Sequence, residues 1–176
     1  MTSEMISVAA GNVPVFLFVA ALLCAWLGWS KEPVAERFLS WILLLPVGAG
    51  GLWAALFHIV LPERTAALIG WQTSPFQFQL GVADLAIGAT GCLAFGRSLG
   101  FKAAAAIAAS VYLLGNALGQ LRQMLVVGDF SARNAGLSFA IDIICPVVSI
   151  ILLVCARRAN RVMSSRNAAM ALRARL

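Results

Sequence analysis

Apolar residues occur in five long runs along the chain, and short polar segments separate the runs. A helix needs roughly 20 predominantly apolar residues to cross the hydrocarbon core of a membrane. The predicted fold class is therefore an all-α polytopic membrane helix bundle. It has one transmembrane domain over residues 1–156 and a basic cytoplasmic tail over residues 157–176. The five predicted transmembrane helices cover residues 13–29, 38–61, 75–95, 103–127 and 135–156.

The composition supports a membrane protein. Hydrophobic residues make up 61% of the chain and charged residues only 11%. Soluble domains carry about 25% charged residues, so this chain lacks the charge to cover a surface that faces water. Its length leaves no room for a separate soluble domain.

The basic residues are concentrated at the C-terminus. The net charge of +6 alone would also suit a nucleic-acid-binding protein. A basic segment directly after an apolar run, however, is typical of the cytoplasmic flank of a membrane helix, and it can attract anionic lipid headgroups. We therefore expect the lipid bilayer as the partner and no nucleic acid, and a homo-oligomer or a second membrane protein stays open. The tail arginines are Arg157, Arg158, Arg161, Arg166, Arg173 and Arg175.

The distribution of Lys and Arg between the loops predicts an orientation. With five spans, the loops on the C-terminal side hold Lys31, Arg37, Arg97 and Lys102 in addition to the tail, whereas the opposite side holds Arg64 and Arg133. Cytoplasmic loops carry the excess of basic residues. The sequence therefore predicts an external N-terminus, a cytoplasmic C-terminus and a location in the cell inner membrane.

Prolines and small residues predict local features of the helices. Pro46 removes a backbone donor and predicts a bend near Ile42. Ser74 and Gln77 fit an S-x-x-Q capping box that starts the helix over 75–95. Small residues on one face let helices approach closely in lipid. Such faces are predicted for Gly48, Gly51, Ala55 and His58; for Gln77, Gly81, Asp84, Gly88 and Gly91; for Gln79, Ala83, Ala86 and Thr90; and for Gly115 and Gly119. The two faces of the helix over 75–95 suggest packing on both sides.

Polar residues inside the predicted spans gather toward the external half. An ionised group in a bilayer normally faces the bundle interior and finds a partner, so we expect Arg122 to pair with Asp142 or Asp84. Both a structural network and a ligand or ion site remain open for these residues. The candidate pocket residues are His58, Gln77, Gln79, Asp84, Asn116, Gln120, Arg122, Gln123 and Asp142.

The chain contains the strings G-W-Q-T-S-P-F-Q (70–77), L-F-H (56–58), P-E (62–63), G-N-A-L-G-Q (115–120) and N-A-G (134–136), and Asp142 with Pro146. Together they resemble the pattern of a family of small, uncharacterised multi-pass membrane proteins of bacteria and archaea. The resemblance covers residues 40 to 155 and implies a membrane fold without an assigned activity. Family members often carry an acid at the position of Gln79 and a histidine at that of Gln120. This chain departs at both positions, and two glutamines exchange only hydrogen bonds.

Three functions stay open at this stage. A non-catalytic protein that binds a small molecule or lipid, or serves as an accessory subunit, suits the small-residue faces and the neutral Asn/Gln stripe. The alternative is a small transporter or proton-coupled carrier, with titrating or gating groups at Asp84, Asp142, Arg122 and His58. A membrane-embedded enzyme with His58 as general base, together with Asp84 or Glu63, is the second alternative. The four cysteines lie in apolar runs without a zinc or disulfide spacing, and no metal or cofactor is predicted.

Overall fold

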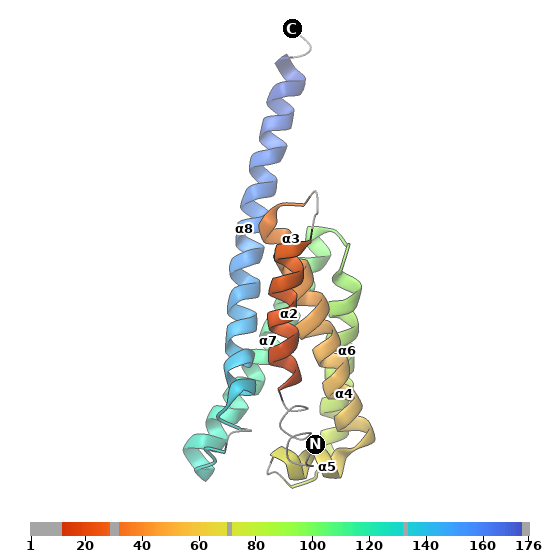
Figure 1. The fold of residues 1–176 in the computed structure, drawn as a ribbon, viewed down its shortest axis with the longest axis vertical. Helices are drawn as coiled ribbons and strands as arrows, with labels where there is room; N and C mark the ends of the chain where they lie inside the picture. Colours follow the sequence, from red (N-terminus) through yellow and green to blue (C-terminus); the bar gives the residue numbers. More distant parts are fainter. Residues whose placement is uncertain (1–11, 29–31, 70–71, 132–133, 174–176) are drawn as a thin grey trace.

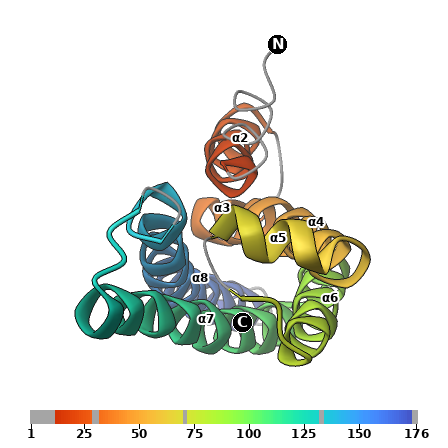
Figure 2. The ribbon, with the colours of Figure 1, turned by 90° about the horizontal axis from the view of Figure 1, so that it is seen from below.

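A computed structural model describes residues 12–28, 32–69, 72–131 and 134–173, and all regular elements in these ranges are helical (Figure 1). The prediction of an all-α chain is therefore confirmed. Most helices run along one long axis, and α5 lies across one end of the bundle (Figure 2). The elements are α2 (Val13–Leu27), α3 (Val34–Ile42), η1 (Leu43–Ala49), α4 (Gly50–Val60), α5 (Pro62–Ile69), α6 (Phe76–Ala94), α7 (Leu99–Arg122), η2 (Gln123–Val127) and α8 (Leu137–Arg173).

Three helices among the described residues are long and apolar enough to cross a membrane. They are the continuous rod of α3, η1 and α4 (Val34–Val60), the rod of α7 and η2 (Leu99–Val127), and α8 over Leu137–Ala171. The apolar helix α2 is shorter, with 15 residues. This set of helices fits a membrane protein.

Pro46 lies inside η1, a π-helical stretch between α3 and α4. In this register an amide donates to the carbonyl five residues back, and the amide of Gly50 bonds the carbonyl of Leu45 in this way. Proline has no amide hydrogen to donate. In the wider π-helical turn, an amide that follows Pro46 donates to a carbonyl that precedes Pro46. The rod therefore continues through Pro46 without ending.

The α4 and α6 helices touch through glycines, as the shared faces predict. A Cβ atom added to Gly51 would lie 2.8 Å from the Cα atom of Gly88. A Cβ atom added to Gly81 would lie 3.0 Å from the Cβ atom of His58. Two backbones can approach this closely only where side chains are absent. The opposite face of α6 is different, because Gln79 and Ala86 are exposed. The prediction that α6 packs on both sides is therefore wrong for the described chain.

The interior of the bundle lies where α2, α3, α7 and α8 meet. The small side chains of α7 there, such as Ala106 and Ala109, leave room for larger ones from neighbouring helices, such as Leu39 and Leu153.

An ion cluster lies near the end of the bundle that is opposite α5. Its members are Lys102, which is 0% exposed, Glu32 and Glu36 with oxygens 2.8 and 2.9 Å from the Lys102 Nζ atom, and Asn160, which donates to Glu36 at 3.0 Å.

Three predicted helix boundaries need correction. The helix that was expected to begin at residue 38 begins at Val34, so Glu36 and Arg37 belong to a helix. The last helix does not stop at residue 156 but continues to Arg173, so the basic segment is helical over its described part. The helix that was expected to begin at residue 103 begins at Leu99, after Ser98, whose side chain accepts from the Phe101 amide at 3.4 Å. Lys102 therefore belongs to a helix and not to a loop.

The predicted capping box at Ser74 is wrong. The α6 helix has Pro75 at its N-cap and no side-chain cap hydrogen bond. The Gln77 side chain instead donates to the carbonyl of Pro62 at 3.0 Å. This bond links the start of α6 to the start of α5, because α5 returns the chain to the same end of the bundle. The sequence also predicts Trp71 at the membrane interface, and this residue lies outside the described residues.

Candidate functional site

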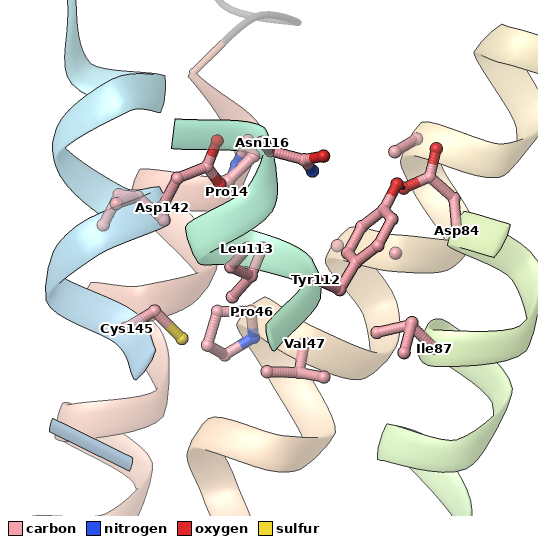
Figure 3. A pocket seen from close by; sticks show the side chains of 14 residues that line it. Pro14, Pro46, Val47, Asp84, Ile87, Tyr112, Leu113, Asn116, Asp142 and Cys145 are labelled. Atoms are coloured by element: carbon pink, nitrogen blue, oxygen red, sulfur yellow. Dashed lines mark hydrogen bonds between the residues drawn. The ribbon is translucent and has the colours of Figure 1, made fainter. Parts of the chain in front are cut away.

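A cavity of about 110 Å³ lies between α2, the rod of η1 and α4, α6, α7 and α8 (Figure 3). Most of its wall is apolar. Four polar side chains interrupt this wall, and they come from three helices: Asp84 from α6, Tyr112 and Asn116 from α7, and Asp142 from α8. The apolar and small residues of the wall are Pro14, Pro46, Val47, Gly50, Gly51, Ala54, Ile87, Leu113, Ile141 and Cys145.

Asp84 reaches the cavity from the glycine face of α6. It is 6% exposed, and it lies one turn after Gly81 and one turn before Gly88 on the face that packs against α4. The Tyr112 hydroxyl donates to its Oδ1 atom at 2.5 Å. This distance lies within the range of hydrogen bonds between two oxygen atoms. Tyr112 therefore fixes the position of Asp84.

Asp142 reaches the cavity from the other side, near the start of α8. The Gln120 side chain donates to its Oδ2 atom at 2.9 Å. Tyr112, Asn116 and Gln120 are spaced four residues apart, so they share one face of α7. The predicted polar stripe on this helix thus connects two carboxyl groups. In Figure 3, Asn116 and Tyr112 of α7 lie between Asp142 and Asp84.

Asn134 supports the Gln120 end of the site. It is 1% exposed, and its Nδ2 atom donates to the carbonyls of Gln120 at 3.1 Å and Asp129 at 2.9 Å. Gly128 ends η2 with a left-handed φ of 74°, a conformation that glycine adopts without steric cost. The loop after η2 can therefore turn back and place Asn134 against the end of α7.

Arg122 does not pair with Asp84 or Asp142, so that prediction is wrong. Arg122 is exposed, and each carboxyl group takes its side-chain hydrogen bond from a neutral residue instead. The reason is the helical repeat. Arg122 follows Gln120 by two residues, which turns it by about 200° around the α7 axis at 3.6 residues per turn. A matching depth in the membrane was not enough to bring the charges together.

The remaining candidates lie outside the cavity wall. The His58 Nδ1 atom is buried and has no hydrogen-bond partner among the described residues. The Gln77 side chain bonds the Pro62 carbonyl, Gln79 is exposed, and Gln123 is half-buried at the start of η2. Of the nine candidates, the structure thus brings Asp84, Asn116 and Asp142 to the cavity and Gln120 to its edge.

Comparison with known proteins places the chain in a family. A model of a family of unknown function, DUF6790, matches residues 11–162. The chain belongs to this family. No curated protein and no solved structure matches the chain. The DUF6790 description assigns no activity, so the arrangement of the site has to carry the functional argument.

In this DUF6790 chain, sequence reasoning missed part of the cavity. Tyr112 has the same four-residue spacing as Asn116 and Gln120, but a tyrosine in an apolar helix has no partner that the sequence can name. Cys145, one of the four cysteines in apolar runs, is 1% exposed and forms part of the wall. The spacing of Cys145 and Asp142 on one face of α8 was the available signal.

The hydrogen bond from Gln120 should matter more than the nearby charge of Arg122. We expect Gln120→Leu to lower the free energy of unfolding by about 1 to 3 kcal/mol, because a buried carboxyl group loses its donor. Arg122→Gln should change it by less than about 0.5 kcal/mol, as exposed substitutions usually do. Chemical unfolding of both variants in detergent micelles measures the difference. A larger loss of stability for Arg122→Gln than for Gln120→Leu would instead support an ion pair between Arg122 and one of the two carboxyl groups.

Proposed function

We propose that this DUF6790 chain is an inner-membrane protein with five spans, an external N-terminus and a cytoplasmic C-terminus. Three spans are the long apolar helices described above. The α6 helix has 19 residues, or about 28 Å at 1.5 Å per residue, close to the roughly 30 Å of a hydrocarbon core. The α2 helix completes the set as a short span. The excess of basic residues on the C-terminal side supports the orientation.

We propose further that the protein binds a small molecule in the cavity and does not catalyse a reaction on it. The observation that carries this proposal is the cavity of about 110 Å³ with a few converging polar groups in a mostly apolar wall. Ligand sites in proteins have this composition. In the proposed orientation the polar groups lie in the external half of the membrane. The ligand would therefore come from the external side or from the outer leaflet.

A small carrier is the second candidate, and the helix irregularities favour it. Pro46 of η1 lies in the cavity wall, and Pro146 lies in α8 next to the wall residue Cys145. Transporters often build their sites at interrupted helices. At the other end, however, the Lys102 ion cluster ties the start of α7 to Glu36 of α3 and through it to α8. A carrier would have to break this cluster during each cycle.

The basic part of α8 is proposed to contact anionic lipid headgroups at the cytoplasmic surface. Arg157, Arg158 and Arg161 are exposed and follow directly after the apolar part of the helix. Each basic residue near an anionic surface contributes about 1 kcal/mol to the attraction. This contact would hold the cytoplasmic end of α8 at the membrane.

Reporter fusions test the proposed topology. We expect a green fluorescent protein fused after Leu176 to fluoresce, because it folds in the cytoplasm. Alkaline phosphatase inserted after Asp129 should be active, because it needs the external side. An active phosphatase at the C-terminus would overturn the proposed orientation.

A cavity-filling variant tests the binding proposal. Butan-1-ol, butylammonium chloride and sodium butyrate serve as probes of one size and different charge. We expect at least one of them to raise the melting temperature of the purified protein saturably. Ala54→Leu, which extends a wall residue into the cavity, should weaken this binding at least tenfold. Ala86→Leu is the matched control, since Ala86 is exposed and outside the wall. If no probe binds, the proposed pocket is wrong.

A further inference from the structure

Among the described residues, the wall of the cavity carries two carboxyl groups and no basic side chain. Asp84 and Asp142 reach it from different helices, and no Lys, Arg or His is among the residues that form it. Each carboxyl group receives one side-chain hydrogen bond within the described residues, from Tyr112 or from Gln120. An ionised carboxylate offers about four lone-pair sites. Most of the accepting capacity at these two groups is therefore unused.

Further acceptors lie beside Asp142. The Oε1 atom of Gln120 is buried and has no donor among the described residues, while the Nε2 atom of the same side chain bonds Asp142. Pro146 lies four residues after Asp142 in α8. Because proline has no amide hydrogen, Pro146 cannot donate the usual helical hydrogen bond to the backbone carbonyl of Asp142. Buried acceptors normally find donors. The surroundings of Asp142 therefore call for a ligand that donates hydrogen bonds.

The positive charges of the described chain lie elsewhere. Lys102 is bound by Glu32 and Glu36, and Arg122 is exposed without an ion pair among the described residues. A carboxylate without a counter-charge is unfavourable within a bilayer, and such groups mark ligand or ion paths. A positively charged ligand would neutralise the two carboxyl groups.

The apolar part of the wall selects among cations. Metal ions such as Ca²⁺ take six to eight oxygen ligands, but carbon atoms of Pro14, Val47, Leu113 and Ile141 make up much of this wall. An alkylammonium ion has both parts that the cavity needs, because its N–H groups donate and its hydrocarbon part packs against apolar residues. A volume of about 110 Å³ leaves room for only a few heavy atoms.

From this arrangement, and resting on the small-molecule pocket proposed above, we propose that the ligand is a small alkylammonium cation. Its ammonium group lies against the carboxyl groups of the wall, and its hydrocarbon part lies against the apolar residues. Asn116, which lies between the two carboxyl groups on α7, offers its amide oxygen as a further acceptor.

Ligand charge is the variable that tests this proposal. Titration calorimetry on the purified full-length protein in detergent compares butylammonium chloride with butan-1-ol, sodium butyrate, sodium chloride and potassium chloride. We expect the dissociation constant of butylammonium to be at least tenfold lower than that of butan-1-ol, with no binding of butyrate. Asp84→Asn and Asp142→Asn should each weaken butylammonium binding at least tenfold. Glu63→Gln, at an exposed acid on α5, should leave it unchanged.

The probes also separate this proposal from the pocket itself. Binding of butan-1-ol or butyrate as tight as that of butylammonium overturns the cationic ligand and leaves the pocket standing. Asp-dependent binding of Na⁺ or K⁺ without butylammonium binding overturns it in favour of a metal cation. Absence of binding by every probe overturns both proposals. The comparison of probes on the wild-type protein needs no variant, so it decides the question even where an Asp→Asn variant does not fold.

Discussion

Replacement of Lys102 by methionine should lower the free energy of unfolding by about 3 to 5 kcal/mol. Lys102 is 0% exposed and lies 2.8 Å from Glu32 and 2.9 Å from Glu36. Removal of one partner from a buried ion pair leaves the other charge uncompensated, which is the source of losses of this size. Here two carboxylates lose the same cation. Thermal and chemical unfolding of the purified protein in detergent micelles measure the loss.

Two further variants separate the ion cluster from a general effect of basic residues. Arg97 lies five residues before Lys102 in the preceding loop and is exposed, so Arg97→Met should cost less than about 0.5 kcal/mol. Glu36→Gln in the Lys102→Met background should recover part of the stability, because it removes the more deeply buried of the two unpaired carboxylates. If Lys102→Met unfolds at the wild-type temperature, the cluster does not stabilise the bundle.

The apolar runs predicted an all-α chain with several long apolar helices, because a helix needs roughly 20 apolar residues to cross a membrane. The spacing of glycines also identified the faces through which α4 and α6 meet, since residues three and four apart share a helix face. Lys102 was misplaced for a related reason. A charged residue next to an apolar run is typical of a loop. The partners of Lys102 are distant in the sequence, and only the fold brings Glu32, Glu36 and Asn160 close to it.

The site was predicted in part. Asp84, Asn116 and Asp142 were found because polar residues in apolar helices are unusual, whereas their partners depend on how the helices are rotated. Depth alone suggested Arg122 as the partner, and the rotation of α7 gave that role to Tyr112 and Gln120. The Ser74 capping box failed in a similar way, because the Pro62 carbonyl, distant in the sequence, accepts from the Gln77 side chain.

Substitution of glycine by alanine should change the free energy of unfolding in opposite directions on α6 and on α7. A Cβ atom at Gly88 would lie 2.6 Å from the Leu52 nitrogen and 2.9 Å from the Gly48 oxygen, and both are backbone atoms of the neighbouring rod. Backbone cannot move aside as a side chain can, so α6 must shift away from η1 and α4. We expect Gly88→Ala to lower the free energy of unfolding by about 3 kcal/mol, at the upper end of typical overpacking losses.

The matched control is the same change on α7. A Cβ atom at Gly115 or Gly119 would meet nothing within 4 Å, and both residues lie inside a regular helix. Alanine is favoured over glycine in a helix interior by about 1 kcal/mol, so Gly115→Ala and Gly119→Ala should each stabilise the protein by up to that amount. Unfolding of the three variants under one condition gives the comparison. A loss of stability at Gly115 or Gly119 equal to that at Gly88 would contradict the open α7 face and indicate that another helix covers it in the membrane. The contrast is informative because helix propensity is the same at all three glycines, so only the distance to the neighbouring backbone can reverse the sign.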